Sequence, residues 1–309
     1  MFTKREIISM KDFSQDEIDC ILKKAQELEV YARGEKPSDL LSGKIMANLF
    51  FEPSTRTRLS FETAMKRLGG EVLNLGSEEA SSISKGETLA DTVRVISQYC
   101  DVLVLRHPKQ GAARMAAEYS SVPIINAGDG AGHHPTQTLL DLYTIKRESR
   151  LNGISVAIVG DLKYGRTVHS LAYALALYDT RISLVSPEQL RIPDTIKSDL
   201  EGMGAEVFET SELSSVINDV DVLYITRIQR ERFPDPAEYR KVAGSYRISV
   251  DLLNDVKDNL IIMHPLPRVT EIDVEVDSTK YAKYFKQTFY GVPIRMALLT
   301  MLMETDDEA

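Results

Sequence analysis

The sequence predicts an α/β protein of two doubly wound, parallel-sheet domains with helices on both faces. Short apolar runs alternate with amphipathic stretches along the chain, which is typical of successive βα units. This alternation stops near the middle of the chain and then starts again. The 309 residues also exceed the roughly 100–200 residues of one usual domain, so each half is long enough for its own core.

In the first half, four apolar runs predict strands, and stretches with helical spacing lie between them. Phe61, Met65 and Leu68 recur at i, i+4 and i+7 before two glycines end that helix. The apolar residues of segment 89–96 repeat the same spacing. The predicted strands are residues 45–51, 71–75, 101–106 and 123–126.

The second half repeats the pattern. Its predicted strands are residues 154–160, 181–186, 206–209, 221–227 and 260–264, and its predicted helices are residues 167–177 and 195–203. The domains are accordingly expected at residues 1–135 and 150–290, joined by a linking helix at residues 136–149. A last apolar helix at about residues 292–309 is expected to pack back onto the first domain.

Composition excludes several classes of protein. The 37 Lys and Arg residues against 46 Asp and Glu residues give a net charge of −9, which argues against broad binding to nucleic acid or to an anionic membrane. No apolar run approaches the about 20 residues of a membrane span, and the charged N-terminus does not resemble a secretory signal. Two cysteines cannot form a disulfide framework, so we expect a cytoplasmic protein.

One segment has the composition of an anion site. A strand leads through Pro53 into a helix whose first residues carry the Ser54, Thr55 and Thr57 hydroxyls and the Arg56 guanidinium. Unpaired amides and the positive end of the helix dipole favour a phosphate at such a terminus. The alternative is an ordinary Ser/Thr helix cap. Arg58 lies about 200° around the helix from Arg56, so we expect only one of them to reach the ligand.

Two predicted strands, one in each half, end in an arginine. They are residues 101–106 (DVLVLR) and residues 221–227 (DVLYITR). Ligands of open α/β sheets bind beyond the carboxyl ends of strands, where Arg106 and Arg227 could grip a phosphate or carboxylate. The alternative is a strand that ends where a charge reaches solvent. The matched pair favours a ligand cleft.

Residues 54–58 (STRTR) in this setting resemble the carbamoyl phosphate-binding signature of the aspartate/ornithine carbamoyltransferase family. Five further blocks follow in the order of that family and span nearly the whole chain. They are residues 81–88 (SSISKGET), 106–108 (RHP), 134–137 (HPTQ), 227–229 (RIQ) and 264–268 (HPLPR).

The resemblance implies a carbamoyl phosphate-binding first domain, an aspartate-binding second domain and a role for each matched residue. The implied catalytic residues are Arg56, Thr57, Lys85, Arg106 and His134. The residues implied to bind carbamoyl phosphate are Ser54, Thr55, Arg56, Thr57, Ser81, Arg106, His134, Gln137 and the backbone of Leu266 and Pro267. Those implied to bind the amino acid are Lys85, Arg166, Arg227 and Gln229. We expect the cationic residues among them to converge on one cleft.

Within this family, the residues favour aspartate over ornithine as the acceptor. The HPLPR block resembles the aspartate version, since the ornithine enzymes typically have His-Cys-Leu-Pro there and a Ser-Met-Gly loop that this chain lacks. Aspartate brings two carboxylates, which suit the Arg166 and Arg227 guanidiniums. The expected reaction gives N-carbamoyl-L-aspartate and phosphate, a step of pyrimidine biosynthesis. A carbamoyltransferase for ornithine or another amine, and an inactive anion-binding scaffold subunit, are the alternatives.

The resemblance also implies a homotrimer in which Ser81 and Lys85 enter the active site of a neighbouring subunit. Residues 107–114 resemble a loop that contacts regulatory chains, but the segment also reads as a plain strand-to-helix connection, so a larger complex stays open. No cofactor is implied: the loop at residues 160–166 lacks G-x-G-x-x-G. No metal is expected at His133 and His134, because no further ligands lie at suitable spacing.

Overall fold

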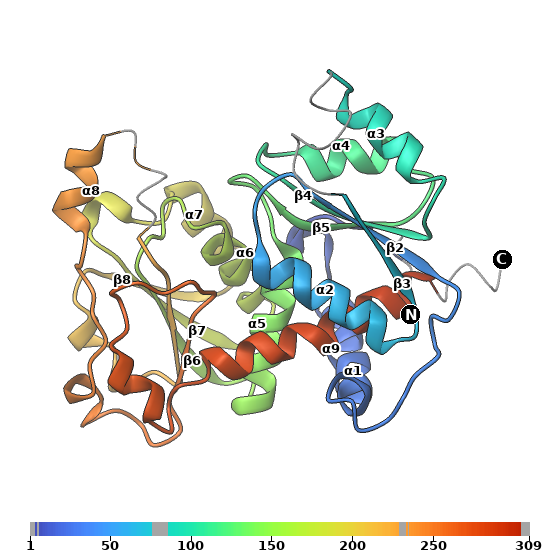
Figure 1. The fold of residues 1–309 in the computed structure, drawn as a ribbon. Helices are drawn as coiled ribbons and strands as arrows, with labels where there is room; N and C mark the ends of the chain where they lie inside the picture. Colours follow the sequence, from blue (N-terminus) through green and yellow to red (C-terminus); the bar gives the residue numbers. More distant parts are fainter. Residues whose placement is uncertain (1–3, 5, 76–85, 229–232, 234, 304–309) are drawn as a thin grey trace. The chain divides into compact units, whose positions relative to one another are not determined.

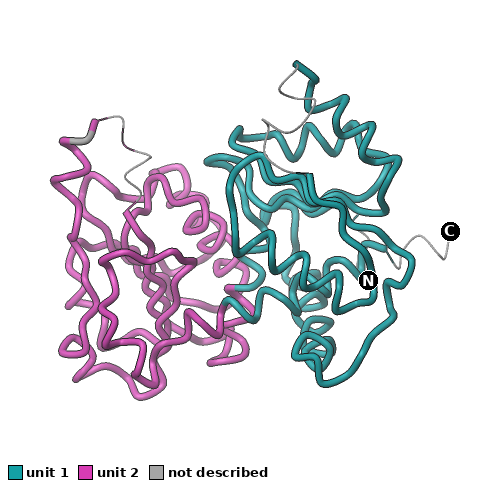
Figure 2. Tube along the Cα trace, viewed as in Figure 1, with its two compact units in different colours: residues 1–140, 288–309 teal, residues 141–287 magenta. Residues whose placement is uncertain are grey.

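The chain forms two compact units (Figure 2). The computed structural model describes residues 4, 6–75, 86–228, 233 and 235–303. One unit comprises residues 1–140 and 288–309, and the other comprises residues 141–287. The chain passes from the first unit to the second within α5 (Pro135–Glu148) and returns within α9 (Tyr284–Met303).

The first unit is built on a five-stranded parallel sheet with the order β1-β5-β4-β2-β3 (Figure 1). Helices α3 and α4 lie on one face of this sheet, and α1 and α2 lie on the other. Alternate strand residues such as Leu49 and Leu103 are buried with Val93 and Ala113 in the core beneath α3 and α4. The elements are β1 (Glu6–Ile7), α1 (Gln15–Ala32), β2 (Ile45–Phe50), α2 (Thr55–Arg67), β3 (Glu71–Leu75), α3 (Leu89–Ile96), β4 (Val102–His107), α4 (Ala112–Tyr119) and β5 (Ile124–Asp129).

The second unit repeats this architecture with the strand order β10-β9-β6-β7-β8, again all parallel. Helices α6 and α7 pack beside one another, and an irregular segment around Leu253 and Val276 covers a core that includes Ala157 and Leu223. The two α/β sheets confirm the predicted fold class. The elements are β6 (Ile154–Val159), α6 (Arg166–Leu175), β7 (Thr180–Val185), α7 (Asp194–Gly202), β8 (Glu206–Thr210), β9 (Val222–Ile225), α8 (Pro236–Val242) and β10 (Ile261–Met263).

The aspartates of the two matched sequences DVLVLR and DVLYITR have the same structural role. Asp101 accepts a hydrogen bond from the Ile45 amide at 2.7 Å, and Asp221 accepts one from the Ser155 amide at 3.0 Å. In each unit, an aspartate before one strand thus accepts a hydrogen bond from an amide at the start of the neighbouring strand. Asp221 also accepts hydrogen bonds from Lys257 and Asn259, and these partners lower its pKa although burial opposes this.

The two predicted strand ends need correction. Arg106 lies within β4, because β4 continues to His107 opposite Asp129 of β5. Arg227 follows β9 by two residues, because the neighbouring strand β6 ends where Gly160 turns with a φ of +120°. A Cβ at Gly160 would lie 2.4 Å from the Thr226 carbonyl oxygen, so this turn requires glycine.

Several helices differ from the expectation. The last helix begins at Tyr284 instead of about residue 292, and Pro293 lies inside it. The Tyr284 side chain is fully buried in the core of the second unit, and this packing extends the helix upstream of the proline. Helices α1 and α8 were not predicted, and α4 was implied only as the helix that follows the connection 107–114. No helix in the described part of the chain is both long and apolar enough to cross a membrane.

Candidate active site

The carboxyl ends of adjacent strands bring the candidate residues of the first unit to one sheet edge. The strand order places β5, β4, β2 and β3 side by side. His134 follows β5, Arg106 lies near the end of β4, and the segment 54–57 follows β2. Residues 76–85, which follow β3 and include Ser81 and Lys85, lie outside the described residues.

The N-terminus of α2 lacks the side-chain contacts of an ordinary Ser/Thr cap. Ser54 occupies the N-cap position with extended backbone angles, but its hydroxyl makes no capping hydrogen bond to the helix amides. The first turn contains no acidic residue and instead carries Arg56, with Arg58 just beyond it. Cations oppose the helix dipole at this end, so the arrangement favours binding of a negatively charged ligand.

Arg56 and Arg106 reinforce this positive site. Partial burial and then the charge of Arg106 lower the pKa of Arg56, which places the two guanidiniums in mutual repulsion. Arg106 is nearly buried, and it donates hydrogen bonds to the Glu52 carboxylate at 2.8 Å and to the Ala127 carbonyl at 3.0 Å. The Arg106 side chain is therefore held in place at the sheet edge, and a bound phosphate would relieve the repulsion.

His134 and Gln137 lie at the start of α5. The His134 carbonyl accepts the amides of Gln137 at 3.0 Å and Thr138 at 3.3 Å, which starts the helix. The imidazole is buried, and its Nδ1 lies 3.4 Å from the Thr136 hydroxyl. When Thr136 donates to Nδ1, the proton resides on Nε2, which then serves as a hydrogen-bond donor. Gln137 is half-buried on the first turn.

In the second unit, the candidate residues also follow adjacent strands. Arg166 is the first residue of α6, the helix after β6, and is nearly buried, while Arg227 follows β9, the neighbour of β6. Thr226 joins the two strand ends: its amide bonds to the Val159 carbonyl at 2.8 Å, and its hydroxyl accepts the Asp161 amide at 3.2 Å. Two guanidinium-bearing segments are thus fixed beside one another.

The loop after β10 follows the carboxyl end of the strand beside β9 in the second sheet. His264 is buried, Leu266 is half-buried and Pro267 is exposed, so the loop rises from the core to the surface. Leu266 has a φ of +55°, a left-handed conformation that is rare for such a side chain. Arg268 forms an ion pair with Asp277 and stacks on Tyr284, which anchors the far end of the loop.

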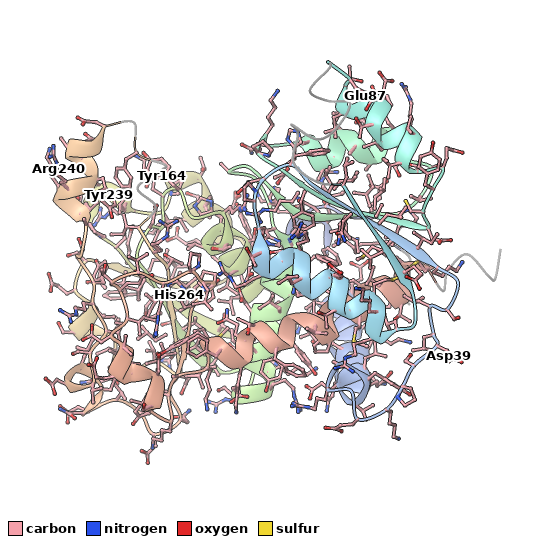
Figure 3. All side chains as sticks on the ribbon, viewed as in Figure 1. Asp39, Glu87, Tyr164, Tyr239, Arg240 and His264 are labelled. Atoms are coloured by element: carbon pink, nitrogen blue, oxygen red, sulfur yellow. The ribbon has the colours of Figure 1, made fainter. Side chains whose placement is uncertain are left out.

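Aromatic contacts surround Phe233, which lies between β9 and α8. Phe233 packs edge-on against Tyr164, with 5.7 Å between ring centroids, and against Tyr239 at 5.6 Å. Tyr164 and Tyr239 lie on the same side of the second unit (Figure 3). Gln229 lies outside the described residues. The convergence of the cationic residues of both units on one cleft stays a prediction.

Two carboxylates of the site were missed at the level of sequence. Glu52 pairs with Arg106, and Glu271 accepts a hydrogen bond from His264 at 2.8 Å. A signal existed for Glu52, which lies two residues before the STRTR motif. Glu271 had none, because it lies seven residues beyond its partner in an irregular segment. Across the described residues, no three His, Cys, Asp or Glu side chains are grouped so that they could hold a metal ion.

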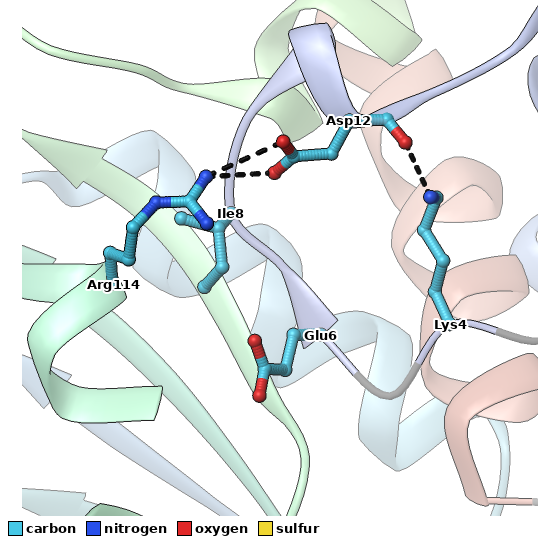
Figure 4. Close-up of a pocket in the computed structure, with 5 residues that line it drawn as sticks. All are labelled: Lys4, Glu6, Ile8, Asp12 and Arg114. Atoms are coloured by element: carbon cyan, nitrogen blue, oxygen red, sulfur yellow. Dashed lines mark hydrogen bonds and ion pairs between the residues drawn. The ribbon is translucent and has the colours of Figure 1, made fainter. Parts of the chain in front are cut away.

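A separate, charged hollow of about 250 Å³ lies in the first unit, lined by Lys4, Glu6, Ile8, Asp12 and Arg114 (Figure 4). Arg114 pairs with the Asp12 carboxylate at 3.0 Å, and Lys4 donates to the Asp12 carbonyl. These contacts are exposed, and the two positive and two negative side chains that line the hollow balance one another. None of the candidate active-site residues lines this hollow.

Comparison with known proteins covers both units. The family model described as aspartate/ornithine carbamoyltransferase, carbamoyl-P binding domain, matches residues 5–147, and the model described as Asp/Orn binding domain matches residues 152–302. The chain belongs to the aspartate/ornithine carbamoyltransferase family. The resemblance that the six sequence blocks carry is thereby confirmed.

Individual carbamoyltransferases are similar over their whole length. The aspartate carbamoyltransferase catalytic subunit of Methanothrix thermoacetophila is 67% identical, with 98% of this chain and 100% of that protein covered. That of Archaeoglobus fulgidus is 64% identical, with 97% and 99% covered. The solved catalytic subunit of M. jannaschii aspartate transcarbamoylase is 57% identical with a TM-score of 0.92, covering 99% of this chain and 100% of that one.

A fourth relative was solved with ligands. Trypanosoma cruzi aspartate transcarbamoylase in complex with carbamoyl phosphate and aspartate is 43% identical, with a TM-score of 0.91 and 96% of each chain covered. The two family matches also include every described candidate residue of this carbamoyltransferase. The first match contains Ser54, Thr55, Arg56, Thr57, Arg106, His134 and Gln137, and the second contains Arg166, Arg227, Leu266 and Pro267.

Proposed function

We propose that this chain is the catalytic chain of an aspartate carbamoyltransferase, which transfers the carbamoyl group of carbamoyl phosphate to the α-amine of L-aspartate. The observation that carries the proposal is the arginine-bearing, acid-free N-terminus of α2 with Arg106 beside it. Relatives with this activity in their names, up to 67% identical and matched along their whole length, support the same substrates.

The first unit would bind carbamoyl phosphate. Ser54, Thr55, Arg56, Thr57 and the α2 amides hold the phosphate, and Thr57, Arg106 and His134 donate to the carbonyl oxygen. Attack of the amine on the carbonyl carbon builds negative charge on that oxygen, which fixed donors stabilise more strongly than mobile water does. The carbon–oxygen bond to phosphate then breaks, and the departing phosphate accepts the amine proton. Neither a serine nor a cysteine nucleophile is required.

The remaining candidate residues would position the second substrate and the carbamoyl amide. Arg166 and Arg227 bind the two carboxylates of aspartate, assisted by Gln229 and Lys85, and the held amine needs little further ordering to react. Gln137 and the backbone of Leu266 and Pro267 bind the carbamoyl amide. Ornithine has an amine where aspartate has its second carboxylate. Its positive charge would be repelled by the two guanidiniums, and this repulsion disfavours ornithine as the acceptor.

A ureido-product assay with aspartate and ornithine side by side tests the function. We expect product with aspartate and carbamoyl phosphate, and none with ornithine. Turnover of ornithine alone would mean that the acceptor is wrong. Absence of turnover with either amine, in a protein that still binds phosphate, would favour the inactive scaffold.

We further propose that the chain forms a homotrimer with shared active sites. We also propose that it works in the reducing cytoplasm, because its two cysteines form no disulfide with one another. β3 is an edge strand that exposes 44% of Leu73, and α2 beside it exposes 50% of Leu59. An apolar sheet edge of this kind is usually covered by another chain. It also immediately precedes the segment that contains Ser81 and Lys85. The segment 107–114, which is exposed at residues 108–111, is the surface we propose for regulatory chains. The native mass distinguishes a trimer from a larger complex.

Chains with Lys85→Ala and chains with His134→Ala, each inactive alone, should regain activity when they are dissociated and reassembled together. In a trimer with shared sites, about a quarter of randomly paired sites combine an intact His134 with an intact Lys85 from the neighbour. Activity of the mixture should therefore approach about a quarter of that of the wild type. Each variant reassembled with itself is the control. A mixture as inactive as its components contradicts the shared site.

A further inference from the structure

His264 makes two directional hydrogen bonds through its ring, and both are buried at the base of the loop 264–268. Nδ1 accepts the Leu266 amide at 2.8 Å, and Nε2 lies 2.8 Å from Glu271 Oε1. The imidazole is 1% exposed, so water does not compete for either nitrogen (Figure 3 labels His264). Glu271 also accepts the Val269 amide at 3.1 Å and the Thr270 amide at 3.0 Å.

These contacts determine where the ring carries its proton. An amide nitrogen can only donate, so Nδ1 must present a lone pair to Leu266. The proton therefore resides on Nε2 and is donated to the Glu271 carboxylate. Burial, opposed by the Glu271 carboxylate, lowers the pKa of His264 and keeps the ring neutral. For Glu271, hydrogen bonds from His264 and backbone amides outweigh burial and lower the pKa to about 2.

The backbone of His264 is fixed as firmly as its ring. Its amide donates to Gln287 Oε1 at 2.9 Å, Gln287 Nε2 donates to Asp141, and Asp141 accepts the Tyr224 hydroxyl at 2.8 Å. All of these side chains are buried. Gln287 belongs to α9 and Asp141 to α5, so side chains from two helices hold the backbone of His264 at the start of the loop.

The bond to Leu266 acts on an unusual backbone. Leu266 has a φ of +55°, a left-handed conformation that is sterically unfavourable for a leucine because Cβ lies close to the following carbonyl oxygen. The hydrogen bond to Nδ1 directly opposes relaxation of this residue. Leu266 and Pro267 are the residues whose backbone we assign to the carbamoyl amide, so the direction of their carbonyls depends on this conformation.

We propose that His264 is a positioning residue for the carbamoyl group, whose Nδ1 holds the Leu266 backbone so that the Leu266 and Pro267 carbonyls meet the carbamoyl amide. This inference rests on the proposed function. It assigns to His264 no contact with substrate. Its effect should fall on recognition of the carbamoyl group and not of the phosphate, which is bound by residues of the other unit.

Two matched variants separate this role from a merely structural one. In His264→Asn, the side-chain oxygen can take the place of Nδ1 and accept the Leu266 amide, but it does not reach Glu271. In His264→Gln, the amide takes the place of Nε2 and reaches Glu271, while the acceptor for Leu266 is lost. Calorimetry measures the affinity of each variant for carbamoyl phosphate and for inorganic phosphate.

We expect His264→Gln to lower the affinity for carbamoyl phosphate about tenfold, the size of one lost hydrogen bond, with the affinity for inorganic phosphate unchanged. His264→Asn should stay within about threefold of wild type for both ligands. Equal losses in the two variants, or a parallel loss of phosphate and carbamoyl phosphate binding, would overturn the positioning role. Wild-type protein that binds phosphate but not carbamoyl phosphate would instead overturn the proposed function.

A measurement on the wild-type protein tests the positioning role without depending on either variant. Long-range proton–nitrogen NMR spectra of histidine-labelled protein report which ring nitrogen carries the proton. We expect His264 to be protonated at Nε2 alone at neutral pH. A proton on Nδ1 would exclude the bond from the Leu266 amide and with it the positioning role.

Discussion

Replacing Arg56 with alanine should lower the affinity for carbamoyl phosphate about 100-fold and leave the fold intact. Charge-assisted hydrogen bonds contribute about 1.5–3 kcal/mol each, and a bidentate contact to phosphate lies at the upper end of this range. Arg56 lies at the surface and is only partly covered by its neighbours, so its removal creates no cavity in the core. Calorimetric titration with carbamoyl phosphate gives the affinity, and thermal unfolding reports the fold.

Arg58→Ala is the matched control for this experiment. Arg58 is also an exposed arginine near the start of α2, but it lies about 200° around the helix from Arg56. The Arg58 variant removes the same charge from the same helix end and should bind carbamoyl phosphate within about threefold of wild type. Equal losses in the two variants would show that only the general positive field matters, which would contradict a specific cradle at Arg56.

Replacing His134 with alanine should lower kcat about 100- to 1,000-fold, the usual effect of losing one donor to a developing oxyanion. The affinity for phosphate should change little, because the phosphate ligands lie on α2. His134→Gln, which can place an amide donor near the position of Nε2, should recover part of the loss. Steady-state kinetics at saturating carbamoyl phosphate and aspartate measure these changes.

The neighbouring histidine supplies the control. His133 is half-buried, and its Nδ1 lies 3.3 Å from the Ser9 hydroxyl, away from the candidate residues. Burial lowers the pKa of His133, with smaller contributions from surrounding charges. His133 is therefore a partly buried imidazole in the same loop as His134. His133→Ala should keep the kcat of wild type. A comparable loss in both variants would mean that the loop, and not the His134 donor, is responsible.

Much of the fold could be predicted from local patterns. The period-2 and 3.6-residue repeats identify most strands and helices, since burial of one face leaves a mark on the sequence. Helix α1 was missed although Ser14 and Glu17 form a capping box at its start, a signal present in the sequence. The early start of α9 had no local signal, because burial of Tyr284 against distant residues decides it.

The sequence by itself determined the family, the chemistry and the residue types, because six short blocks carry them in order and each block is local. It also placed the phosphate motif at a helix start. The tertiary structure alone decided which charges meet. The pairing of Arg106 with Glu52, the repulsion between Arg106 and Arg56, and the buried bonds from His264 to Leu266 and Glu271 were not predicted. The first two join Arg106 of β4 to the segment that follows β2, and the pairing of these two strands follows from packing that no periodicity records. The third follows from a loop conformation that burial stabilises.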